Sequence, residues 1–400
     1  MSNWEVKRLK DLVDINPETL STKKYNGKIE YIDISSVNNG QLEKYTTYEI
    51  SEAPSRARRI IRPNDTIFST VRPNLKAYYF VKNCPDNAIC STGFAVLRAK
   101  KNSNSRFIYS LITENSFIDY LSLVAKGTAY PAVDTSDFLK AKLNVPDLPT
   151  QERIADILSS YDDLIENNNR RIELLEKAAQ ELYKEWFVRF RFPGHEHSKM
   201  VNGIPEGWEV KRINEVADTI GGGTPSTNIP EYWENGKIKW ITPTDITNNK
   251  NTVLISVEKQ ITELGLSKSS TKLLPENTIL MTSRASIGYF GMIEEKVCTN
   301  QGFISLIPKN TNTTYYLLLN LMSRKEEIEA RATGATFKEI SKSSFRKMKI
   351  VLPTENVSKQ FNQISQHSYT KINRIKQQNQ NLKKQRDLLL PRLMSGKLDV

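Results

Sequence analysis

The sequence has little of what disulfide-stabilised or metal-binding proteins require. Among its 400 residues there are only three cysteines and three histidines. Cys84, Cys90 and Cys298 are too few and too scattered for a disulfide framework or a four-cysteine zinc site. His195 and His197 have no further histidine or cysteine near them in the sequence, so we expect them to lie in an exposed linker and to bind no metal.

Long apolar segments are also absent. No run of hydrophobic residues is long enough to span a bilayer, and the segment from Met1 to Arg8 lacks the apolar stretch of a secretory signal. We therefore expect a cytoplasmic protein with no membrane partner. Hydrophobic residues make up 38% of the chain and charged residues 26%, which is typical of globular proteins, and the length allows more than one domain.

The signatures of several enzyme classes are missing or incomplete. An adenine methyltransferase needs a cofactor-binding glycine loop and an Asn/Asp-Pro-Pro-Tyr/Phe motif, and neither occurs. The glycine-rich segment Gly221–Thr227 lacks the Gly-Lys-Ser/Thr ending of a phosphate-binding loop. The Glu-x-Lys pattern of metal-dependent nucleases occurs at Glu5–Lys7 and Glu209–Lys211, but it is short and common, and no acidic residue precedes Glu5. We therefore expect no catalytic residues and no cofactor.

The net charge of +12 favours a polyanionic partner, because lysine and arginine release counterions when they neutralise phosphates. Charge alone does not distinguish DNA from RNA or an anionic surface.

The chain repeats itself after about half its length. Trp4–Leu9 recurs as Trp208–Ile213, and Pro63–Ile67 recurs loosely as Pro275–Ile279. An arginine follows the latter segments at the same distance, at Arg72 and Arg284. Further matches in the same order are Gly93-Phe94 with Gly302-Phe303, Gly127–Tyr130 with Gly334–Phe337, and Phe138–Pro146 with Phe345–Pro353. This pattern indicates a tandem duplication and excludes a short-period solenoid.

Each repeat begins with a mixed α/β segment and ends with one long helix. Short β-type runs occur at Ile29–Ile34, Ala77–Val81 and Lys237–Ile241, and helical stretches at Ser105–Val124 and Thr314–Ala332.

The first long helix is expected to begin after Pro149, with Thr150 as its N-cap. Its residues alternate at spacings of four and three, as in the seam of a coiled coil. These residues are Ile154, Leu158, Tyr161, Ile165, Asn168, Ile172, Leu175, Ala179, Leu182 and Trp186. Such a helix is on the order of 50 Å long. The alternative, an ordinary core helix, accounts less well for the length and the strict alternation.

The second long helix follows Pro353 in the same register, and Pro391 is expected to bend or end it. Its seam residues are Phe361, Ser365, Ser368, Ile372, Ile375, Asn379, Leu382, Arg386, Leu389 and Leu393. Repeats related by a pseudo-twofold axis would place the two helices antiparallel. If the axis passes near residue 170, Asn168 and Asn379 share a layer, and we expect them to hydrogen-bond and fix the register.

The fold predicted from these patterns is of the α/β class. Two mixed α/β domains alternate with two long helices that pack as an antiparallel coiled coil in a pseudo-twofold internal repeat. The predicted boundaries are a first domain at 1–146, a central helix at 147–190, a linker at 191–204, a second domain at 205–353 and a C-terminal helix at 354–400.

Three groups of motifs then carry a family resemblance. One runs through Gly222–Thr227, Pro230–Trp233 and Trp240–Ile246; the others are Pro149–Ile154 and Ala179–Val188 followed by Phe192-Pro193-Gly194. Over essentially the whole chain the sequence resembles the specificity subunits of type I restriction-modification enzymes. It departs from their pattern at Asn356–Gln360, where a Gln-Glu pair is usual.

The resemblance implies a non-catalytic reader of double-stranded DNA. Each α/β domain would be a target recognition domain for one half of a bipartite site, and the helix pair would be a spacer. The pair would also dock two methyltransferase subunits, which use S-adenosylmethionine to methylate adenine N6. Motor-nuclease subunits, which use ATP and Mg, would add restriction.

Residues repeated between the two domains are the candidates for DNA contact, because bases are read by side chains such as Arg, Lys, Asn and Gln, and other polar groups bind phosphates. They are Arg72, Lys76, Thr128 and Tyr130 in the first domain, and Arg284, Ser286, Thr336 and Lys338 in the second. The alternative for each is a structural turn or a surface charge. The alternative for the whole chain is a coiled-coil adaptor that binds only proteins, which would leave two basic β-rich domains of matching design unexplained.

Overall fold

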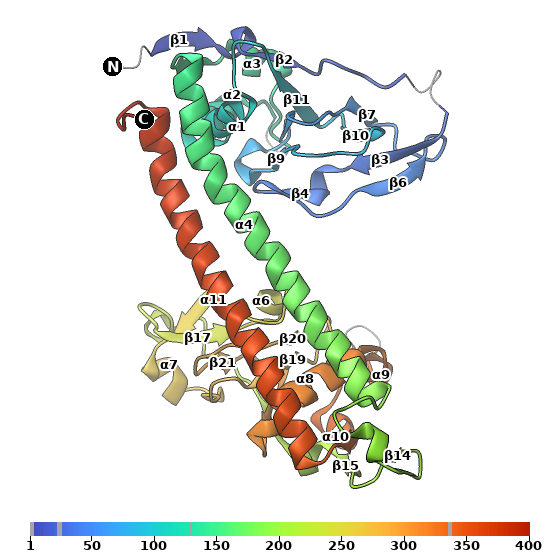
Figure 1. Ribbon diagram of the computed structural model, residues 1–400. Coiled ribbons are helices and arrows are strands. Elements are labelled where there is room, and N and C mark those ends of the chain that lie inside the picture. Colours follow the sequence, from blue (N-terminus) through green and yellow to red (C-terminus); the bar gives the residue numbers. More distant parts are fainter. Residues whose placement is uncertain (1–3, 22–25, 128–129, 335–337) are drawn as a thin grey trace. The chain divides into compact units, whose positions relative to one another are not determined.

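The computed structural model describes residues 4–21, 26–127, 130–334 and 338–400 and divides the chain into two compact units. Unit 1 comprises residues 1–165 and 381–400, and unit 2 comprises residues 166–380. Two long helices contribute residues to both units: α4 (Leu148–Tyr183), which continues as a π-helical turn at Lys184–Val188, and α11 (Glu355–Met394) (Figure 1). Among the described residues, no helix is both long and apolar enough to cross a membrane.

Unit 1 is built on short strands in several small sheets. One sheet has the order β2-β11-β8-β9 and a second the order β6-β3-β10-β7, while β1 pairs only with β12 and β4 with β5. The strands are β1 Glu5–Arg8, β2 Val13–Ile15, β3 Lys28–Ile32, β4 Val37–Asn38, β5 Gln41–Leu42, β6 Thr46–Glu49, β7 Ala57–Ile60, β8 Thr66–Ser69, β9 Tyr78–Phe80, β10 Ala88–Ser91, β11 Phe94–Ala99 and β12 Lys142–Val145.

Three short helices cover the core of unit 1: α1 (Ser105–Thr113), α2 (Asn115–Val124) and α3 (Thr135–Lys140). The helical stretch predicted for 105–124 is therefore confirmed as two helices, α1 and α2. Glu114 adopts an extended conformation and its carboxylate accepts a hydrogen bond from the Ser116 amide at 2.9 Å, so it ends α1 and caps α2. The core of unit 1 contains the first turns of α4 and the last turn of α11.

Unit 2 repeats the framework of unit 1. Its main sheet has the order β16-β22-β19-β20, which matches β2-β11-β8-β9 strand for strand, and β15 pairs with β23 as β1 pairs with β12. A second sheet has the order β18-β17-β21, and β13 pairs with β14. The strands are β13 Met200–Val201, β14 Ile204–Pro205, β15 Glu209–Arg212, β16 Ala217–Gly221, β17 Ile238–Ile241, β18 Lys259–Ile261, β19 Ile279–Thr282, β20 Phe290–Gly291, β21 Cys298–Thr299, β22 Phe303–Pro308 and β23 Lys349–Leu352.

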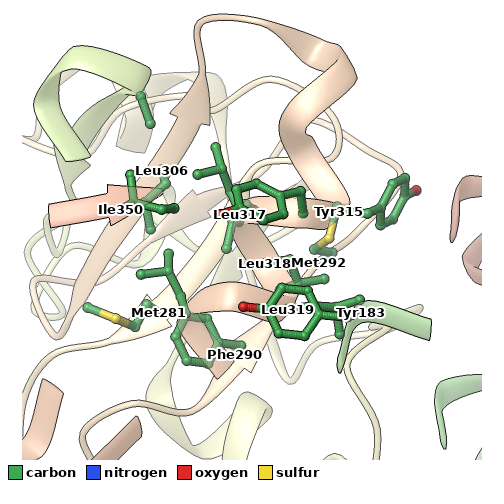
Figure 2. Packing of buried hydrophobic residues seen from close by; sticks show 14 of the residues in the cluster. Tyr183, Met281, Phe290, Met292, Leu306, Tyr315, Leu317, Leu318, Leu319 and Ile350 are labelled. Atoms are coloured by element: carbon green, nitrogen blue, oxygen red, sulfur yellow. The ribbon is translucent and has the colours of Figure 1, made fainter. Parts of the chain in front are cut away.

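The core of unit 2 lies between its main sheet, the helix α8 and the two long helices. Tyr183 of α4 lies beside the α8 residues Leu317–Leu319 (Figure 2), and its hydroxyl accepts a hydrogen bond from Asn320 at 2.9 Å. The helices of unit 2 are α5 Ile213–Val216, α6 Pro243–Thr247, α7 Glu263–Ser267, α8 Thr314–Ser323, α9 Lys325–Ala330 and α10 Lys342–Arg346. The helix predicted for 314–332 is interrupted at Arg324, which lies outside helical geometry (φ −111°, ψ 24°).

The ends of the long helices differ from the sequence predictions. Helix α4 begins at Leu148, before Pro149, and the cap is Asp147, whose carboxylate accepts a hydrogen bond from the Thr150 amide at 3.0 Å. Thr150 is therefore not the N-cap. The helix can include Pro149 in its first turn, because the backbone amides of that turn have no partner within the helix. Helix α11 continues through Pro391 to Met394, so the proline does not end the helix at its own position.

The strand pairing also corrects the alignment of the repeats. Equivalent pairs are Phe94 with Ser69 in unit 1 and Phe303 with Thr282 in unit 2. Counting from these pairs, Arg284 corresponds to Val71, and Arg72 corresponds to Ala285. Arg72 and Ala285 both have positive φ, 49° and 57° respectively. The expected equivalence of Arg72 and Arg284 is therefore wrong by one residue. The sequence match aligned two prolines, whereas the equivalent residues are Asn64 and Asn277, both in the left-handed region.

The fold class predicted from the sequence is confirmed: two mixed α/β domains of matching design alternate with two long helices that pack against each other.

Candidate nucleic-acid interface

A turn between the last two core strands organises the candidate surface of unit 1. It consists of Thr92 and Gly93 and joins β10 to β11. The Thr92 amide donates a hydrogen bond to the carbonyl of Arg56 at 2.8 Å, and the Gly93 carbonyl accepts one from the Thr70 amide, also at 2.8 Å. The turn therefore holds together the start of β7 and the segment that follows β8.

The segment after β8 places two of the predicted residues side by side. Arg72 donates a backbone hydrogen bond to Pro131 at 2.7 Å, and its guanidinium carbon lies 4.7 Å from the centre of the Tyr130 ring. Tyr130 is 72% exposed, so this cation–π pair lies at the surface. Lys76 has positive φ and donates from Nζ to Asn115 Oδ1 at 2.9 Å. Thr128 lies outside the described residues.

Arg56 belongs to the same surface and is not among the residues predicted from the sequence. Its Nε donates to the Tyr31 hydroxyl at 3.1 Å, and its Nη2 to Asp33 Oδ2 at 2.5 Å. The side chain of Arg56 is nevertheless 58% exposed. Burial of Asp33 opposes its ionisation, but hydrogen bonds from the Ser35 amide, Tyr31 and Arg56 hold the pKa of this carboxyl below its usual value.

The equivalent turn in unit 2, Asn300–Gly302, joins β21 to β22 and carries different side chains. The Gly302 carbonyl accepts a hydrogen bond from the Ser283 amide at 2.7 Å, in the same way as Gly93 and Thr70 in unit 1. The exposed Gln301 accepts a hydrogen bond from the Thr224 hydroxyl at 2.5 Å. Thr224 comes from the glycine-rich segment, so this segment helps to build the surface although it has no phosphate-binding signature.

The predicted residues of unit 2 lie near this turn. Arg284 Nε forms an ion pair with Glu339 Oε1 at 2.8 Å, so its charge is balanced locally. Ala285 donates a backbone hydrogen bond to Lys338 at 3.1 Å, and the side chains of Ser286 and Lys338 are exposed. Thr336 lies outside the described residues.

The two long helices contact each other within both units. In unit 1, Arg386 Nη1 of α11 lies 2.5 Å from Asp162 Oδ1 of α4. In unit 2, the rings of Trp186 and Phe361 have centroids 5.7 Å apart. The start of α4 thus meets the end of α11, and the end of α4 meets its start, which makes the pair antiparallel.

The predicted seam residues face the interior to different degrees. Ile154, Leu158, Ile165, Asn168, Ile172, Ile372, Ile375 and Asn379 are buried, and Tyr161, Leu175, Leu182, Leu382 and Leu389 are half-buried. Asn168 Nδ2 donates to Asn379 Oδ1 at 2.9 Å, the bond that the heptad register predicts. Asn379 Nδ2 in turn donates to Asn169 Oδ1 at 2.9 Å.

Within the described part of the chain, no group of three or more His, Cys, Asp or Glu side chains is arranged to hold a metal ion.

Comparison with known proteins supports the duplication and the fold. The family model for the type I restriction modification DNA specificity domain matches twice, at residues 1–177 and 205–384. The type I restriction enzyme HindI specificity subunit of Haemophilus influenzae is 24% identical over 465 residues, covering 100% of both chains. The MjaIX specificity subunit of Methanocaldococcus jannaschii is 27% identical over 414 residues, covering 100% of this chain and 94% of the relative.

A solved structure shares the fold at low sequence identity. The S subunit of a type I restriction-modification system from M. genitalium aligns with a TM-score of 0.61 and 17% identity, covering 98% of this chain and 96% of that chain.

Proposed function

The chain belongs to the type I restriction-modification DNA specificity family, and from this premise we propose that it reads a bipartite site in double-stranded DNA, with one half-site for each α/β domain. As a specificity subunit it recognises DNA sequence and is not itself an enzyme.

One observation carries the proposal: the same framework occurs twice with different side chains at the equivalent turn. The main sheets of the two units have matching strand orders. The turn of unit 1 is flanked by Arg56, which is paired with Asp33, and by Arg72, whereas that of unit 2 presents Gln301 and Arg284, which is paired with Glu339. A common framework with different polar groups suits two readers of different sequences, because hydrogen bonds to base edges specify sequence.

We further propose the boundaries 1–146 and 205–353 for the two target recognition domains, with helices at 147–190 and 354–400 and a linker at 191–204. The helix pair would set the spacing between half-sites. Since the repeats present related surfaces, the pair would dock two methyltransferase subunits that use S-adenosylmethionine, and motor-nuclease subunits that use ATP and Mg would join them. Such a complex would act in the cytoplasm, on chromosomal and incoming DNA.

The test is to map methylated adenines in cells that carry the complete system. Residues 1–146 would be exchanged for those of another family member. Within this segment, the residues that pack against Leu393 and Met394 of α11 would be kept, because these contacts belong to the core of unit 1. We expect one half of the methylated motif to change and the other to persist. The persisting half also shows that the exchanged protein folds and assembles.

A change in both halves would contradict the division into two readers. If deletion of the gene changes no methylated motif and the purified complex binds all duplexes equally, the adaptor alternative would replace the reader.

A further inference from the structure

We propose that Arg56 reads a guanine in the half-site recognised by unit 1, and that Tyr31 and Asp33 are positioning residues for its guanidinium. The inference rests on the proposed function and adds a residue and a base to it.

The hydrogen bonds of Arg56 fix one edge of its guanidinium. Nε donates to the Tyr31 hydroxyl at 3.1 Å and Nη2 to Asp33 Oδ2 at 2.5 Å. A guanidinium has five N–H donors in a rigid plane, so further donors on Nη1 and Nη2 are not used by these two bonds. Paired donors of this kind form the bidentate contact with O6 and N7 of guanine in the major groove.

The support for Arg56 is itself held in place. The Tyr31 side chain is buried, at 2% exposure, and its hydroxyl donates to Asp33 Oδ2 at 3.0 Å while it accepts from Arg56. Asp33 also accepts a hydrogen bond from the Ser35 amide at 3.3 Å. Such a triad restricts the rotamers of a long side chain before DNA binds, which reduces the entropy lost on binding.

Another arginine of unit 1, Arg98, shows what a fully engaged structural pair looks like here. Arg98 donates from Nε and Nη2 to Asp65 and from Nη1 to Glu18, so all three nitrogens are engaged, and its side chain is 30% exposed. Arg62 donates from Nη2 to Glu18 at 3.1 Å, and lies beyond the other end of β7. Arg56 differs from Arg98 in having one engaged edge and 58% exposure.

The position of Arg56 also places it with the other candidates. The Thr92 amide binds the Arg56 carbonyl, and the next residue of the turn, Gly93, binds the Thr70 amide. Two residues beyond Thr70 is Arg72, stacked over the exposed ring of Tyr130. Two arginines thus flank one turn, an arrangement that suits a DNA surface in which one side chain reads a base and others bind phosphates.

The experiment uses the full-length protein in complex with its methyltransferase. Duplexes carrying the mapped motif, each changed at one base pair, would be compared by equilibrium binding for the wild type, Arg56→Ala, Arg56→Lys, Tyr31→Phe and Asp33→Asn. The matched control is Arg62→Ala, which removes an arginine from a carboxylate pair of the same domain.

For Arg56→Ala we expect discrimination at one G·C pair of one half-site to fall about 10- to 100-fold, the range given by loss of a bidentate contact. Arg56→Lys should lose most of the same discrimination, since lysine lacks the planar fork. Tyr31→Phe and Asp33→Asn should lower it at the same pair by a smaller factor, while Arg62→Ala should behave as the wild type. Unchanged binding to the other half-site shows in each case that the protein is folded.

An equal loss of affinity for all duplexes, with a shallower salt dependence, would identify Arg56 as a phosphate contact and overturn the inference. Unchanged discrimination in Arg56→Ala would overturn it as well. If the wild type itself shows no preferred sequence, it is the proposed function that fails, and the variants are not needed to show it.

Discussion

The asparagine pair between the long helices should respond differently to one substitution and to two. Asn168 is 0% exposed and Asn379 6% exposed, and they are joined by a hydrogen bond of 2.9 Å. We expect Asn168→Leu and Asn379→Leu each to destabilise the protein, and the double variant to be as stable as the wild type or more so.

The magnitudes follow from which partners remain. In Asn168→Leu, Asn379 Oδ1 loses its donor in a buried layer, although its Nδ2 still donates to Asn169; in Asn379→Leu, Asn168 Nδ2 retains Gln378 Oε1 at 3.4 Å. A buried polar group left unpaired costs about 1–3 kcal/mol. In the double variant no Asn168 or Asn379 amide remains, and each buried leucine contributes about 1.5–3 kcal/mol, reduced by about 1–3 kcal/mol where it is overpacked. Because each remaining amide keeps another partner, we expect each single penalty at the lower end of its range, about 1–1.5 kcal/mol. The leucine contributions cancel in the comparison, so the coupling should be the sum of the two penalties, about 2–3 kcal/mol in favour of the double variant.

The assay is urea-induced unfolding followed by far-UV circular dichroism, with Asn167→Leu as a matched control. Asn167 is exposed on the same helix turn, so its substitution should leave the transition within about 0.5 kcal/mol of the wild type. The double variant should also hold its helix register less tightly, which cross-linking between cysteines introduced on the two helices would detect. A double variant less stable than both single variants would refute this account of the layer.

Two further predictions concern charged residues of the long helices. The substitution Arg386→Met should lower the stability of the protein by about 1–2 kcal/mol, because it leaves the charge of half-buried Asp162 without its partner. This value lies between those for exposed and buried ion pairs. In thermal unfolding, adding Asp162→Asn to this variant should recover part of the lost stability. The Glu176 carboxylate accepts a hydrogen bond from the Thr252 amide at 2.6 Å, and burial raises its pKa. The folded state therefore binds a proton at Glu176 more tightly than the unfolded chain does. As a result, the stability of the protein falls as the pH rises from the unfolded-state pKa to the folded-state pKa. Glu176→Gln keeps the hydrogen-bond acceptor without the charge, so it should remove this pH dependence and be at least as stable as the wild type at neutral pH. A melting temperature below that of the wild type at every pH would contradict the expected sign.

The sequence predicted the features that depend on repeated apolar spacing. The heptad pattern located both long helices, and the matching segments located the duplication, because a core position must stay apolar wherever the framework is reused. Helix ends were less predictable. Asp147 caps α4 from one residue before Leu148, and Pro391 is accommodated in the last turns of α11, where few hydrogen bonds remain to be broken.

The candidate surface was predictable only in part, for a reason visible at Arg72 and Arg284. Their spacing from a proline is the same in both repeats, yet the strand register shifts one of them by a residue. The residue with positive φ at this place is Arg72 in unit 1 and Ala285 in unit 2, so similarity in a turn does not establish equivalence of the residues beyond it.

Arg56 was missed for the opposite reason, because nothing in the other repeat resembles it. It immediately precedes β7, the edge strand of the sheet β6-β3-β10-β7. In the part of unit 2 that the structure describes, the corresponding sheet β18-β17-β21 has no strand in the place of β7. The two units therefore agree where strands must pack on a core and differ at an edge strand that begins beside the candidate turn. A search for repeated residues finds the shared framework, whereas side chains that distinguish one half-site from the other must lie where the repeats diverge.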